Sequence, residues 1–421
     1  MMGEWKEYKL GEIAKIKGGK RLPKGSTLIK TKTQHPYIRV RDMGDRFIPT
    51  SDLEYVPNDV FPLIKNYTVN KNDVILSIVG SVGLVSIVNE ELHHASLTEN
   101  CVKIIPVTNL LNYNFLFYYL TSSIGQDEIH RRIVGAVQPK LPIYNINAIS
   151  IKLPDLPTQT AIAEILSSLD DKIELNNNIN KELEKLAQTL FKQWFIEFEF
   201  PDENGEPYQS SGGEMIESEL GMIPKNWEVR KLSALIRLTG GGTPKRSNAE
   251  YWDGKIKWFS IQDIPNDSQV FVVDTKEKIT ELGLNKSSTK LLPRGTTIIT
   301  ARGTVGKLAL VAEPMAMNQS CYGVNGASGL GEFYTYFNLK NAVEKLRQNV
   351  HGAVFDTITS NTFDTIKSIY GNNDLANLFE EIVRPMMEQI ENHCRENQEL
   401  SNLRDTLLPK LISGELNVKD L

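Results

Sequence analysis

The sequence predicts an α+β protein in which two tandem modules of mixed α and β structure are joined by two long antiparallel coiled-coil helices, with pseudo-two-fold symmetry. Three observations lead to this prediction. The chain repeats itself, each copy mixes strand-like and helical patterns, and each copy is followed by a long helical pattern. A repeat of this size and order indicates two equivalent modules, and 421 residues suffice for two or three domains with separate cores.

The repeat consists of short segments that match in the same order along the chain. The matching pairs are residues 5–10 with 227–232, 16–19 with 238–241, 37–43 with 258–264, 80–83 with 303–306, and 135–137 with 352–354. Outside these segments the two copies differ heavily. We therefore expect two modules that keep one fold but present two different surfaces, as the binding of two different targets would require.

Within each module, short apolar runs lie between Gly and Pro turns and predict strands. Residues 73–79 and 297–300 are such runs, whereas residues 115–120 and 342–346 have a helical pattern. Each module is therefore predicted to contain a twisted sheet together with helices.

A helix with a coiled-coil seam is predicted after each module. Apolar residues recur at spacings of three and four, and the second series follows the first at an offset of 217 positions. The seam residues are Ile162, Leu166, Leu169, Ile173, Leu183, Leu190 and Trp194, then Phe379, Val383, Met386, Ile390, Leu400, Leu407 and Leu411. Roughly 36 residues at about 1.5 Å each give a helix on the order of 54 Å, which is long enough to act as a spacer.

Polar residues interrupt both seams at matching positions, Asn176 and Asn180 in the first helix and His393 and Asn397 in the second. Buried polar residues in a seam cost stability but fix register and orientation. We interpret the four as a register device or as a polar belt that faces a partner. The alternative is that solvent or fraying makes them harmless.

Helix start signals and a polar linker set the predicted boundaries. Pro and Thr residues near position 157 precede the first helix, Asn373 and Asp374 precede the second, and turn-forming residues follow the first. The predicted parts are a first module at 1–155, a spacer helix at 156–200, a linker at 201–220, a second module at 221–372, and a second spacer helix with a C-terminal tail at 373–421.

The net charge of −5 conceals an uneven distribution. Residues 155–219 carry fifteen acidic side chains against four lysines, whereas residues 4–45 carry eleven Lys and Arg against five acids, and residues 225–257 carry eight against three. One basic cluster could simply make a surface soluble. Because both clusters open a repeat, they favour surfaces that face phosphate groups.

Common enzyme motifs are absent from the sequence. It has no amino-methyltransferase signature of the Asn-Pro-Pro-Tyr kind, no Gly-x-Gly cofactor turn after a strand and no Walker loop. His93 and His94 lack a zinc-binding pattern. Asp42 and Asp263 recur in the two copies, and we expect each to stabilise a turn or to bind a neighbouring backbone group. We therefore predict no catalytic residue, no metal and no cofactor.

The cysteines and the hydropathy pattern suggest a cytoplasmic protein with no membrane partner. Cys101, Cys321 and Cys394 are isolated, which indicates neither a zinc site nor a disulfide framework and favours buried or incidental thiols. The opening segment is charged, and no later apolar run approaches about 20 residues, so neither a signal peptide nor a membrane span is predicted.

Three segments resemble the specificity subunit of type I restriction-modification enzymes. They are Leu-Phe-Lys-Gln-Trp-Phe leading into Phe-Glu at 190–199, Gly-Met-Ile-Pro-Lys-Asn-Trp-Glu at 221–228, and Leu-Pro-Lys-Leu-Ile-Ser-Gly-Glu-Leu at 408–416. The resemblance implies two target recognition domains joined by two helices. It also implies that the chain brings two methyltransferase subunits and a translocating restriction subunit to a bipartite sequence in double-stranded DNA.

Position in the repeat supplies candidate residues. Base reading requires Arg, Lys, Gln or Asn near the groove, and phosphate binding requires Lys and Arg. The DNA-binding candidates are Lys20, Arg21, Lys24, Arg39, Arg41, Gln138, Lys140, Lys245, Arg246, Ser260, Gln262, Arg302 and Lys307. A two-helix rod cannot bury all of its apolar positions, so some should bind methyltransferase subunits. The partner-binding candidates are Phe191, Trp194, Phe195, Leu408, Leu411 and Ile412.

Two other functions are compatible with the residues. A coiled-coil scaffold could use the repeated domains to bind protein or carbohydrate, and it would show no salt-dependent affinity for duplex DNA. A stand-alone enzyme with a dispersed site would show turnover as a single purified chain. The basic clusters disfavour the scaffold, and the missing motifs disfavour the enzyme.

Overall fold

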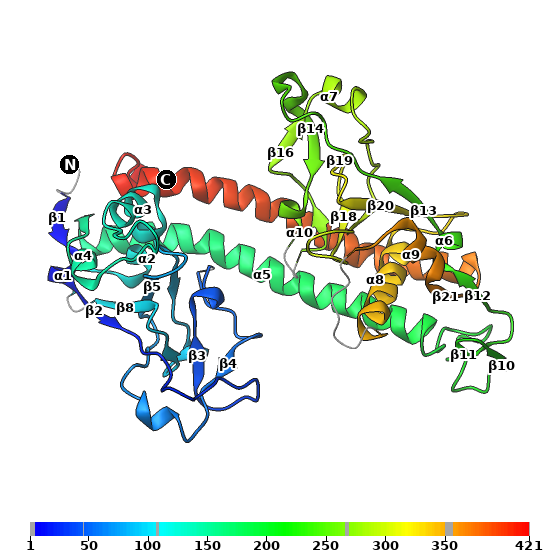
Figure 1. Cartoon of the computed structure of the whole chain (residues 1–421), viewed down its shortest axis with the longest axis horizontal. Coiled ribbons are helices and arrows are strands. Elements are labelled where there is room, and N and C mark those ends of the chain that lie inside the picture. The colour runs from blue at the N-terminus through cyan, green and yellow to red at the C-terminus, as the bar shows by residue number, and fades with distance from the viewer. Residues whose placement is uncertain (1–4, 45, 107–108, 266–268, 350–356, 421) are drawn as a thin grey trace. The chain divides into compact units, whose positions relative to one another are not determined.

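Residues 5–44, 46–106, 109–265, 269–349 and 357–420 are described by the computed structural model, and contacts divide the chain into two compact units (Figure 1). The first unit comprises Met1–Lys172 and Leu400–Leu421, and the second comprises Ile173–Glu399. Two long helices, α5 (Leu156–Phe195) and α10 (Asn373–Ser413), each contribute residues to both units. The boundaries of the predicted domains stay a prediction.

The first unit contains short strands and helices before α5. Its strands are β1 (Lys6–Lys9), β2 (Ala14–Gly18), β3 (Pro36–Ile38), β4 (Glu54–Tyr55), β5 (Val74–Ser77), β6 (Val85–Ile87), β7 (Ser96–Leu97), β8 (Cys101–Pro106) and β9 (Ser150–Leu153). Its helices are α1 (Leu10–Ile13), α2 (Tyr113–Thr121), α3 (Ser123–His130) and α4 (Ile143–Asn147). The predicted strand at 73–79 and helix at 115–120 are confirmed by β5 and α2.

The second unit repeats this succession between α5 and α10. Its strands are β10 (Met215–Ser218), β11 (Gly221–Pro224), β12 (Glu228–Lys231), β13 (Ile236–Gly240), β14 (Trp252–Phe259), β15 (Phe271–Val272), β16 (Glu277–Ile279), β17 (Thr297–Thr300), β18 (Leu308–Val311), β19 (Ala316–Met317), β20 (Cys321–Gly326) and β21 (Lys367–Tyr370). Its helices are α6 (Leu232–Leu235), α7 (Glu281–Asn285), α8 (Glu332–Asn349) and α9 (Ser360–Thr365). β17 and α8 confirm the predicted strand at 297–300 and helix at 342–346.

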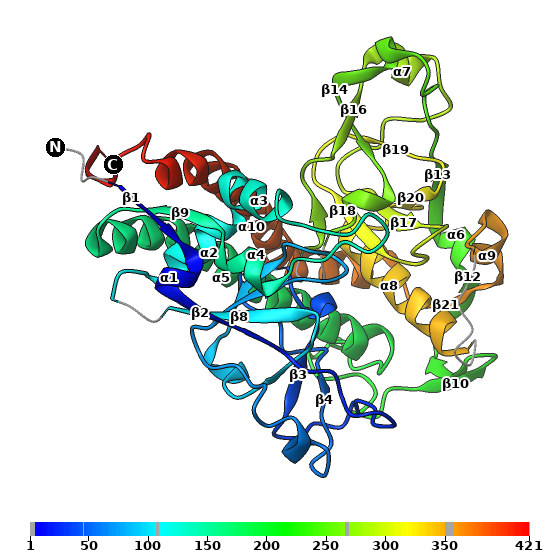
Figure 2. The ribbon, with the colours of Figure 1, turned by 60° about the vertical axis from the view of Figure 1, so that its left-hand side comes forward.

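The two units have the same sheet topology except that the larger sheet of the second unit gains a fifth strand, β15. The larger sheet has the strand order β2-β8-β5-β6 in the first unit and β13-β20-β17-β18-β15 in the second. A three-stranded sheet has the order β4-β3-β7 in one unit and β16-β14-β19 in the other, with β3 parallel to β7 and β14 parallel to β19. In Figures 1 and 2, α7 lies beside β14 and β16 at the tip of the second unit. The repeat in the sequence therefore corresponds to a repeated mixed α and β fold.

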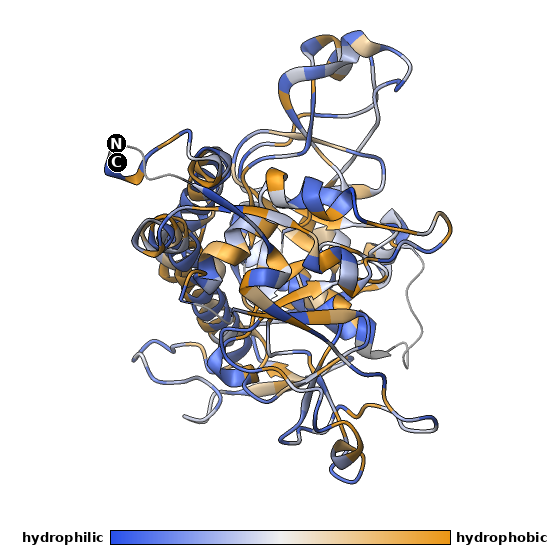
Figure 3. Ribbon diagram, turned by 90° about the vertical axis from the view of Figure 1, so that its left-hand side faces the viewer, coloured by the Kyte–Doolittle hydropathy of each residue, from blue (hydrophilic) through white to orange (hydrophobic). Residues whose placement is uncertain are grey.

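Each core combines a module with segments of both long helices. In the first unit, Ile162 and Leu166 near the start of α5 and Leu411 and Ile412 near the end of α10 belong to one buried cluster. Both helices are amphipathic, and Figure 3, which views them nearly end-on, shows both hydrophobic and hydrophilic residues on them. The end of α10 thus completes the core of the unit that begins the chain.

The core of the second unit is likewise built from its module and from both long helices. Here the end of α5 and the start of α10 contribute. Phe191 and Phe195 near the end of α5 pack with Phe379 near the start of α10. The ring centroid of Phe379 lies 5.6 Å from that of Phe191 and 5.5 Å from that of Phe195, both in edge-to-face geometry. Tyr334 of α8 lies 5.0 Å from Phe195. Such aromatic pairs contribute beyond the apolar area that they bury.

The four polar seam residues pair with one another inside the second unit. The side-chain amide of Asn176 donates to Asn397 Oδ1 at 2.9 Å, and Asn180 Oδ1 lies 2.8 Å from His393 Nδ1. All four residues are buried. Because the later residue of α5 pairs with the earlier residue of α10, the two helices run antiparallel here. The alternative of solvent-exposed, harmless polar positions is therefore wrong, and the pairing fits a register device.

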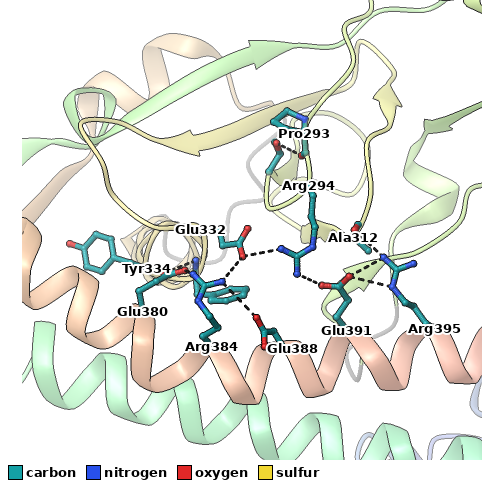
Figure 4. A network of polar contacts seen from close by, with 12 residues as sticks. Pro293, Arg294, Ala312, Glu332, Tyr334, Glu380, Arg384, Glu388, Glu391 and Arg395 are labelled. Carbon is teal, nitrogen blue, oxygen red and sulfur yellow. Dashed lines mark hydrogen bonds and ion pairs between the residues drawn. The ribbon is translucent and has the colours of Figure 1, made fainter.

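An ion-pair network attaches α10 to the module of the second unit (Figure 4). The guanidinium of Arg294, which precedes β17, contacts Glu391 of α10 at 2.6 Å and Glu332 of α8 at 3.5 Å. Arg395 contacts Glu391 at 2.9 Å. Glu391 is 6% exposed, so its carboxylate is held almost out of water between two arginines.

A second part of the network lies at the start of α8 (Figure 4). The Glu380 carboxylate accepts hydrogen bonds from the backbone N–H groups of Phe333 at 3.0 Å and Tyr334 at 2.9 Å, and it contacts Arg384 at 2.9 Å. An anion at the first turn of a helix satisfies free N–H groups and faces the positive end of the helix dipole. A residue of α10 thus caps a helix of the module.

One region differs from the sequence-based expectation, and another lies outside the described residues. The predicted linker at 201–220 contains β10, which pairs with β11 as an antiparallel hairpin. This strand was missed because its four residues, Met-Ile-Glu-Ser, carry only a weak strand pattern. The repeated Gly-Ala-Val at 135–137 is described, whereas its counterpart at 352–354 lies outside the described residues.

Candidate nucleic-acid interface

The candidate segments of the first unit meet at the turn formed by residues 97–101, which joins β7 to β8 and which we call the central turn. The N–H of Gly19 donates to the Cys101 carbonyl at 3.1 Å, and the N–H of Lys20 donates to the Leu97 carbonyl at 2.8 Å. A Cβ atom on Gly19 would lie only 2.0 Å from the Thr98 carbonyl oxygen. Gly19 thus permits a close approach of two backbones that no other residue allows.

The other candidate segments are tied to the same turn. The N–H of Thr98 donates to the Ile38 carbonyl at 3.1 Å, just before Arg39. The N–H of Ile78 donates to the Asn100 carbonyl at 2.8 Å, and Ile78 in turn accepts a hydrogen bond from Leu141 at 2.9 Å. Segments 19–24, 39–41 and 138–140 therefore emerge around one turn.

The second unit repeats this frame at residues 317–321, its own central turn. A Cβ atom on Gly241 would lie 1.9 Å from the Asn318 carbonyl oxygen. The equivalent backbone bonds are Gly242 N–H to Met317 at 2.9 Å, Asn318 N–H to Phe259 at 2.9 Å, Ala301 N–H to Ser320 at 2.8 Å, and Ile358 N–H to Ala301 at 2.9 Å. The two modules thus hold their candidate segments by the same backbone contacts.

The recurring Gly-x-x-Gly segments form equivalent turns after β5 and β17. Gly80 and Gly83 have φ values of 83° and 99°, and Gly303 and Gly306 have values of 75° and 76°, in the left-handed region that favours glycine. In each turn a hydroxyl of the preceding strand donates to a carbonyl inside the turn. Arg302 and Lys307 flank the second of these turns.

Asp42 and Asp263 stabilise equivalent short helical turns, as predicted. The Asp42 carboxylate accepts a hydrogen bond from the N–H of Arg39 at 2.8 Å, and the Asp263 carboxylate accepts one from the N–H of Ser260 at 2.8 Å. Asp263 also accepts from the N–H of Lys276 at 2.8 Å. Both carboxylates therefore act as hydrogen-bond acceptors for backbone N–H groups.

Most of the DNA-binding candidates lie on the surface of their unit. The exposed ones are Lys20, Arg21, Lys24, Arg41, Gln138, Lys140, Lys245, Arg246, Gln262 and Arg302, and Lys307 is half-buried. Gln138 and Lys140 belong to a loop closed by hydrogen bonds between Val134 and Lys140 at 2.8 and 2.9 Å. That loop carries Val137, whose side chain is almost wholly exposed.

Two candidates have structural partners that limit contact with DNA. The Arg39 guanidinium contacts Asp42 at 3.0 Å and also Glu54, and its side chain is only 17% exposed. The hydroxyl of Ser260 donates to the Asp263 carboxylate at 2.9 Å. Each of these two side chains stabilises a turn, and its contact with DNA stays a prediction.

Arg246 is held by aromatic rings as well as by charge. Its guanidinium carbon lies 3.9 Å from the ring centroid of Trp252 and 5.1 Å from that of Trp258, and the group pairs with Glu277. A guanidinium stacked in this way is fixed in direction. The hydrogen bond from Arg246 also holds the pKa of Glu277 below its ordinary value.

The partner-binding candidates lie inside the two cores. Their exposed fractions are 3% for Phe191, 7% for Trp194, 3% for Phe195, 0% for Leu411 and 2% for Ile412, and Leu408 is half-buried. This placement does not fit the expectation that a partner covers them, because helices and strands of this chain already do. The helices present other apolar residues to solvent: Leu175, Ile179, Leu186, Leu378, Ile382 and Leu403.

Sequence reasoning missed the side chains at the centre of each central turn. Glu99 contacts Arg21 at 2.5 Å, and Gln319 accepts a hydrogen bond from Thr243. A signal for them existed, because Thr-Glu-Asn-Cys at 98–101 matches Asn-Gln-Ser-Cys at 318–321 in the same register. The match was too short and too polar to stand out beside the glycine motifs.

No cluster of three or more His, Cys, Asp or Glu side chains suited to a metal ion occurs in the described part of the chain. Cys101, Cys321 and Cys394 are buried free thiols. Burial raises the pKa of Cys101 and of Cys321 to about 12 and that of Cys394 to about 11. Among the described residues, every helix is too short or too polar to cross a membrane.

Comparison with known proteins finds relatives of one kind along nearly the whole chain. A family profile described as "Type I restriction modification DNA specificity domain" matches residues 2–185 and 224–369. The specificity subunit of the type I restriction enzyme HindI from Haemophilus influenzae is 26% identical over 476 aligned positions, which cover 99% of this chain and 100% of that protein. The specificity subunit of MjaIX from Methanocaldococcus jannaschii is 25% identical, with coverage of 99% and 95%.

A solved structure shares the fold. The type I restriction-modification S subunit from M. genitalium aligns with a TM-score of 0.57 at 16% identity, covering 97% of this chain and 96% of that one. The family profile matches in two segments that together span most of the chain, one over each module. This protein therefore belongs to the type I restriction-modification DNA specificity family.

Proposed function

We propose that this chain is the DNA sequence-recognition subunit of a type I restriction-modification complex. Each module reads one half of an asymmetric bipartite target, and the chain itself catalyses no reaction. The observation that carries the proposal is the shared backbone frame of the two modules, which presents different exposed side chains around each central turn. Two modules with the same backbone frame but different exposed side chains suit the recognition of two different half-sites.

The exposed basic candidates support contact with the DNA backbone. Lys20 and Lys24 in one module and Lys245 and Arg302 in the other are exposed beside the frame. Lysine and arginine neutralise phosphate groups and release counterions, so binding should weaken steeply as salt rises. A protein- or carbohydrate-binding scaffold would lack this dependence on salt.

Methylation mapping tests the proposal directly. DNA from cells that express this chain together with its methyltransferase subunit is compared with DNA from cells that express the methyltransferase alone. We expect a split, asymmetric motif only when the chain is present. The absence of a new motif, with an intact complex verified by size-exclusion chromatography, would refute the proposal.

Methyltransferase subunits are proposed to bind the exposed apolar face of α5. Leu175, Ile179 and Leu186 are 54%, 38% and 53% exposed. At 3.6 residues per turn, spacings of four and eleven place the three side chains on one face of the helix. Exposed leucines on one helical face indicate a protein contact.

Charged substitutions on this face test the proposed contact. Leu175→Lys together with Leu186→Lys should release the methyltransferase during co-purification, whereas Lys185→Glu, an exposed change off that face, should not. Co-purification of the methyltransferase with the double variant would refute the assignment. Phe195→Asp is unsuitable, because Phe195 is buried and its replacement would disrupt the core of the second unit.

The long helices are proposed to set the spacing of the two half-sites. Insertion of about two heptads into both helices would leave each module unchanged while lengthening the helical connection. We expect the mapped motif to keep both half-sites and to gain base pairs between them. A changed half-site sequence would contradict this role.

A further inference from the structure

The centre of each central turn carries a pair of side chains that occupies the same place in both modules. Arg21 and Thr243 each follow the second glycine of their repeat by two residues, and Glu99 and Gln319 each lie in the middle of a central turn. Arg21 Nε lies 2.5 Å from a Glu99 carboxylate oxygen, and the Thr243 hydroxyl donates to the Gln319 amide oxygen. The two pairs join equivalent positions, but the first is an ion pair and the second is a hydrogen bond between neutral side chains.

The frame beneath these pairs is constant. Gly19 and Gly241 press against the backbone of the turn, with a hypothetical Cβ at 2.0 and 1.9 Å from a carbonyl oxygen. The parallel pairings of β3 with β7 and β14 with β19 fix the other side of each turn. Because backbone contacts position the turn, the side chains above it can vary without loss of the fold.

Stability does not account for the first pair. The side chain of Arg21 is 81% exposed, and exposed ion pairs contribute little because water and salt screen them. Glu99 is 30% exposed, and its second oxygen accepts a hydrogen bond from the Thr98 hydroxyl at 3.1 Å. A pair that the fold does not require is free to serve recognition.

The charge of Glu99 also points to base contact. A carboxylate on a surface that faces phosphates is repelled unless a cation or a hydrogen-bond donor compensates it, and Arg21 is that cation in the free protein. Partial burial would raise the pKa of Glu99, but hydrogen bonds from Arg21 and Thr98 outweigh this effect and lower the pKa. Glu99 therefore remains an ionised acceptor near neutral pH.

Building on the proposed function, we infer that Arg21 with Glu99 and Thr243 with Gln319 are base-reading pairs, one in each module. On binding, Glu99 accepts a hydrogen bond from the amino group of cytosine or adenine while Arg21 turns to guanine or to a phosphate. Gln319 offers one acceptor and two donors, which suits an adenine edge. The two modules thus use different chemistry at one shared position.

Exchange of the pairs between modules tests the inference in the complete complex with its methyltransferase. The double variant Arg21→Thr, Glu99→Gln should change or relax one base pair in one half-site of the methylation motif and leave the other half-site intact. The reciprocal variant Thr243→Arg, Gln319→Glu should alter only the other half-site. Lys152→Gln, an exposed change on β9, is the matched control.

The outcomes separate this inference from the proposed function. A wild-type complex that yields no split motif would refute the proposed function, and with it the inference. A wild-type split motif that both exchanged variants also yield, unchanged, would overturn the inference alone. If a variant complex methylates no DNA, its affinity is measured for duplexes that each carry a single base-pair change in the target. Loss of about tenfold or more discrimination at one base pair supports the inference, and uniform weakening across all duplexes overturns it.

Discussion

Glu380 offers the sharpest test of the energetics described above. Its carboxylate binds the N–H groups of Phe333 and Tyr334 and contacts Arg384, and the residue is 5% exposed. In Glu380→Ala, the first turn of α8 loses its anionic cap, which costs about 0.5–2 kcal/mol. Two backbone donors are left without a partner in a buried place, and each such group costs about 1–3 kcal/mol.

The expected destabilisation is smaller than the sum of these terms. Burial raises the pKa of Glu380, although the hydrogen bonds from Tyr334 and Phe333 and the charge of Arg384 oppose this effect. Removal of a partly desolvated carboxylate therefore returns some free energy. We expect a net loss of about 3 kcal/mol, which would lower the Tm by roughly 6–12 °C in a unit of this size.

Differential scanning calorimetry and urea titration of the purified chain measure this loss. Glu381→Ala is the matched control, because Glu381 is the next residue of α10 and is exposed. An exposed glutamate should change the free energy of unfolding by no more than about 0.5 kcal/mol. Equal stability of the two variants would refute the reasoning.

The pH dependence of the same site follows from the raised pKa. The folded state binds the proton of Glu380 more tightly than the unfolded state, whose pKa is near the ordinary 4.5. The contribution of Glu380 to the free energy of unfolding must therefore fall as the pH rises from that value through the folded pKa. Glu380→Gln keeps an acceptor oxygen without titrating, so the stability of the wild type relative to this variant should decline over that window. A relative stability that rises with pH would contradict the raised pKa.

Two further predictions concern close packing and the thiols. Gly241→Ala should destabilise the second unit by about 2 kcal/mol or more, because its Cβ would collide with a backbone carbonyl, whereas Gly240→Ala has open space and should be nearly neutral in urea titration. Equal effects of the two alanines would show that the close approach is relaxed at little cost. At pH 8, Cys101, Cys321 and Cys394 should resist iodoacetamide in the folded chain and react only in urea, since burial raises their pKa values. Rapid labelling of the folded protein, measured by mass spectrometry, would count against the buried placement.

The repeat was predictable because its glycines meet backbone demands that other residues do not. Gly19 and Gly241 are required where two backbones touch, and Gly80 and Gly303 are required where φ is positive. Such positions leave a mark in the sequence because glycine recurs at them in both copies. The long helices were predictable because a seam at spacings of three and four is a local pattern.

The surroundings of individual side chains were not predictable in this way. Arg39 looked like any exposed arginine until the fold brought Glu54 to it from a different strand. Phe191 lay on the apolar stripe of a helix, and periodicity does not tell whether a partner subunit or the same chain covers that stripe. In the structure it is covered by Phe337 of α8 and Phe379 of α10. Contacts between segments that are distant in the sequence determine what surrounds such a side chain.

The shared core of the first unit has a consequence for the order in which the chain folds. Leu411 and Ile412 are buried in the same cluster as Leu10 and Phe115, and Gly414 lies against the ring of Trp5. During synthesis on the ribosome, the first module cannot complete its core until the end of α10 has been made. By that time every residue of Ile173–Glu399 has already been synthesised. The core of the unit that begins the chain is therefore completed last, after the end of α10 has been made.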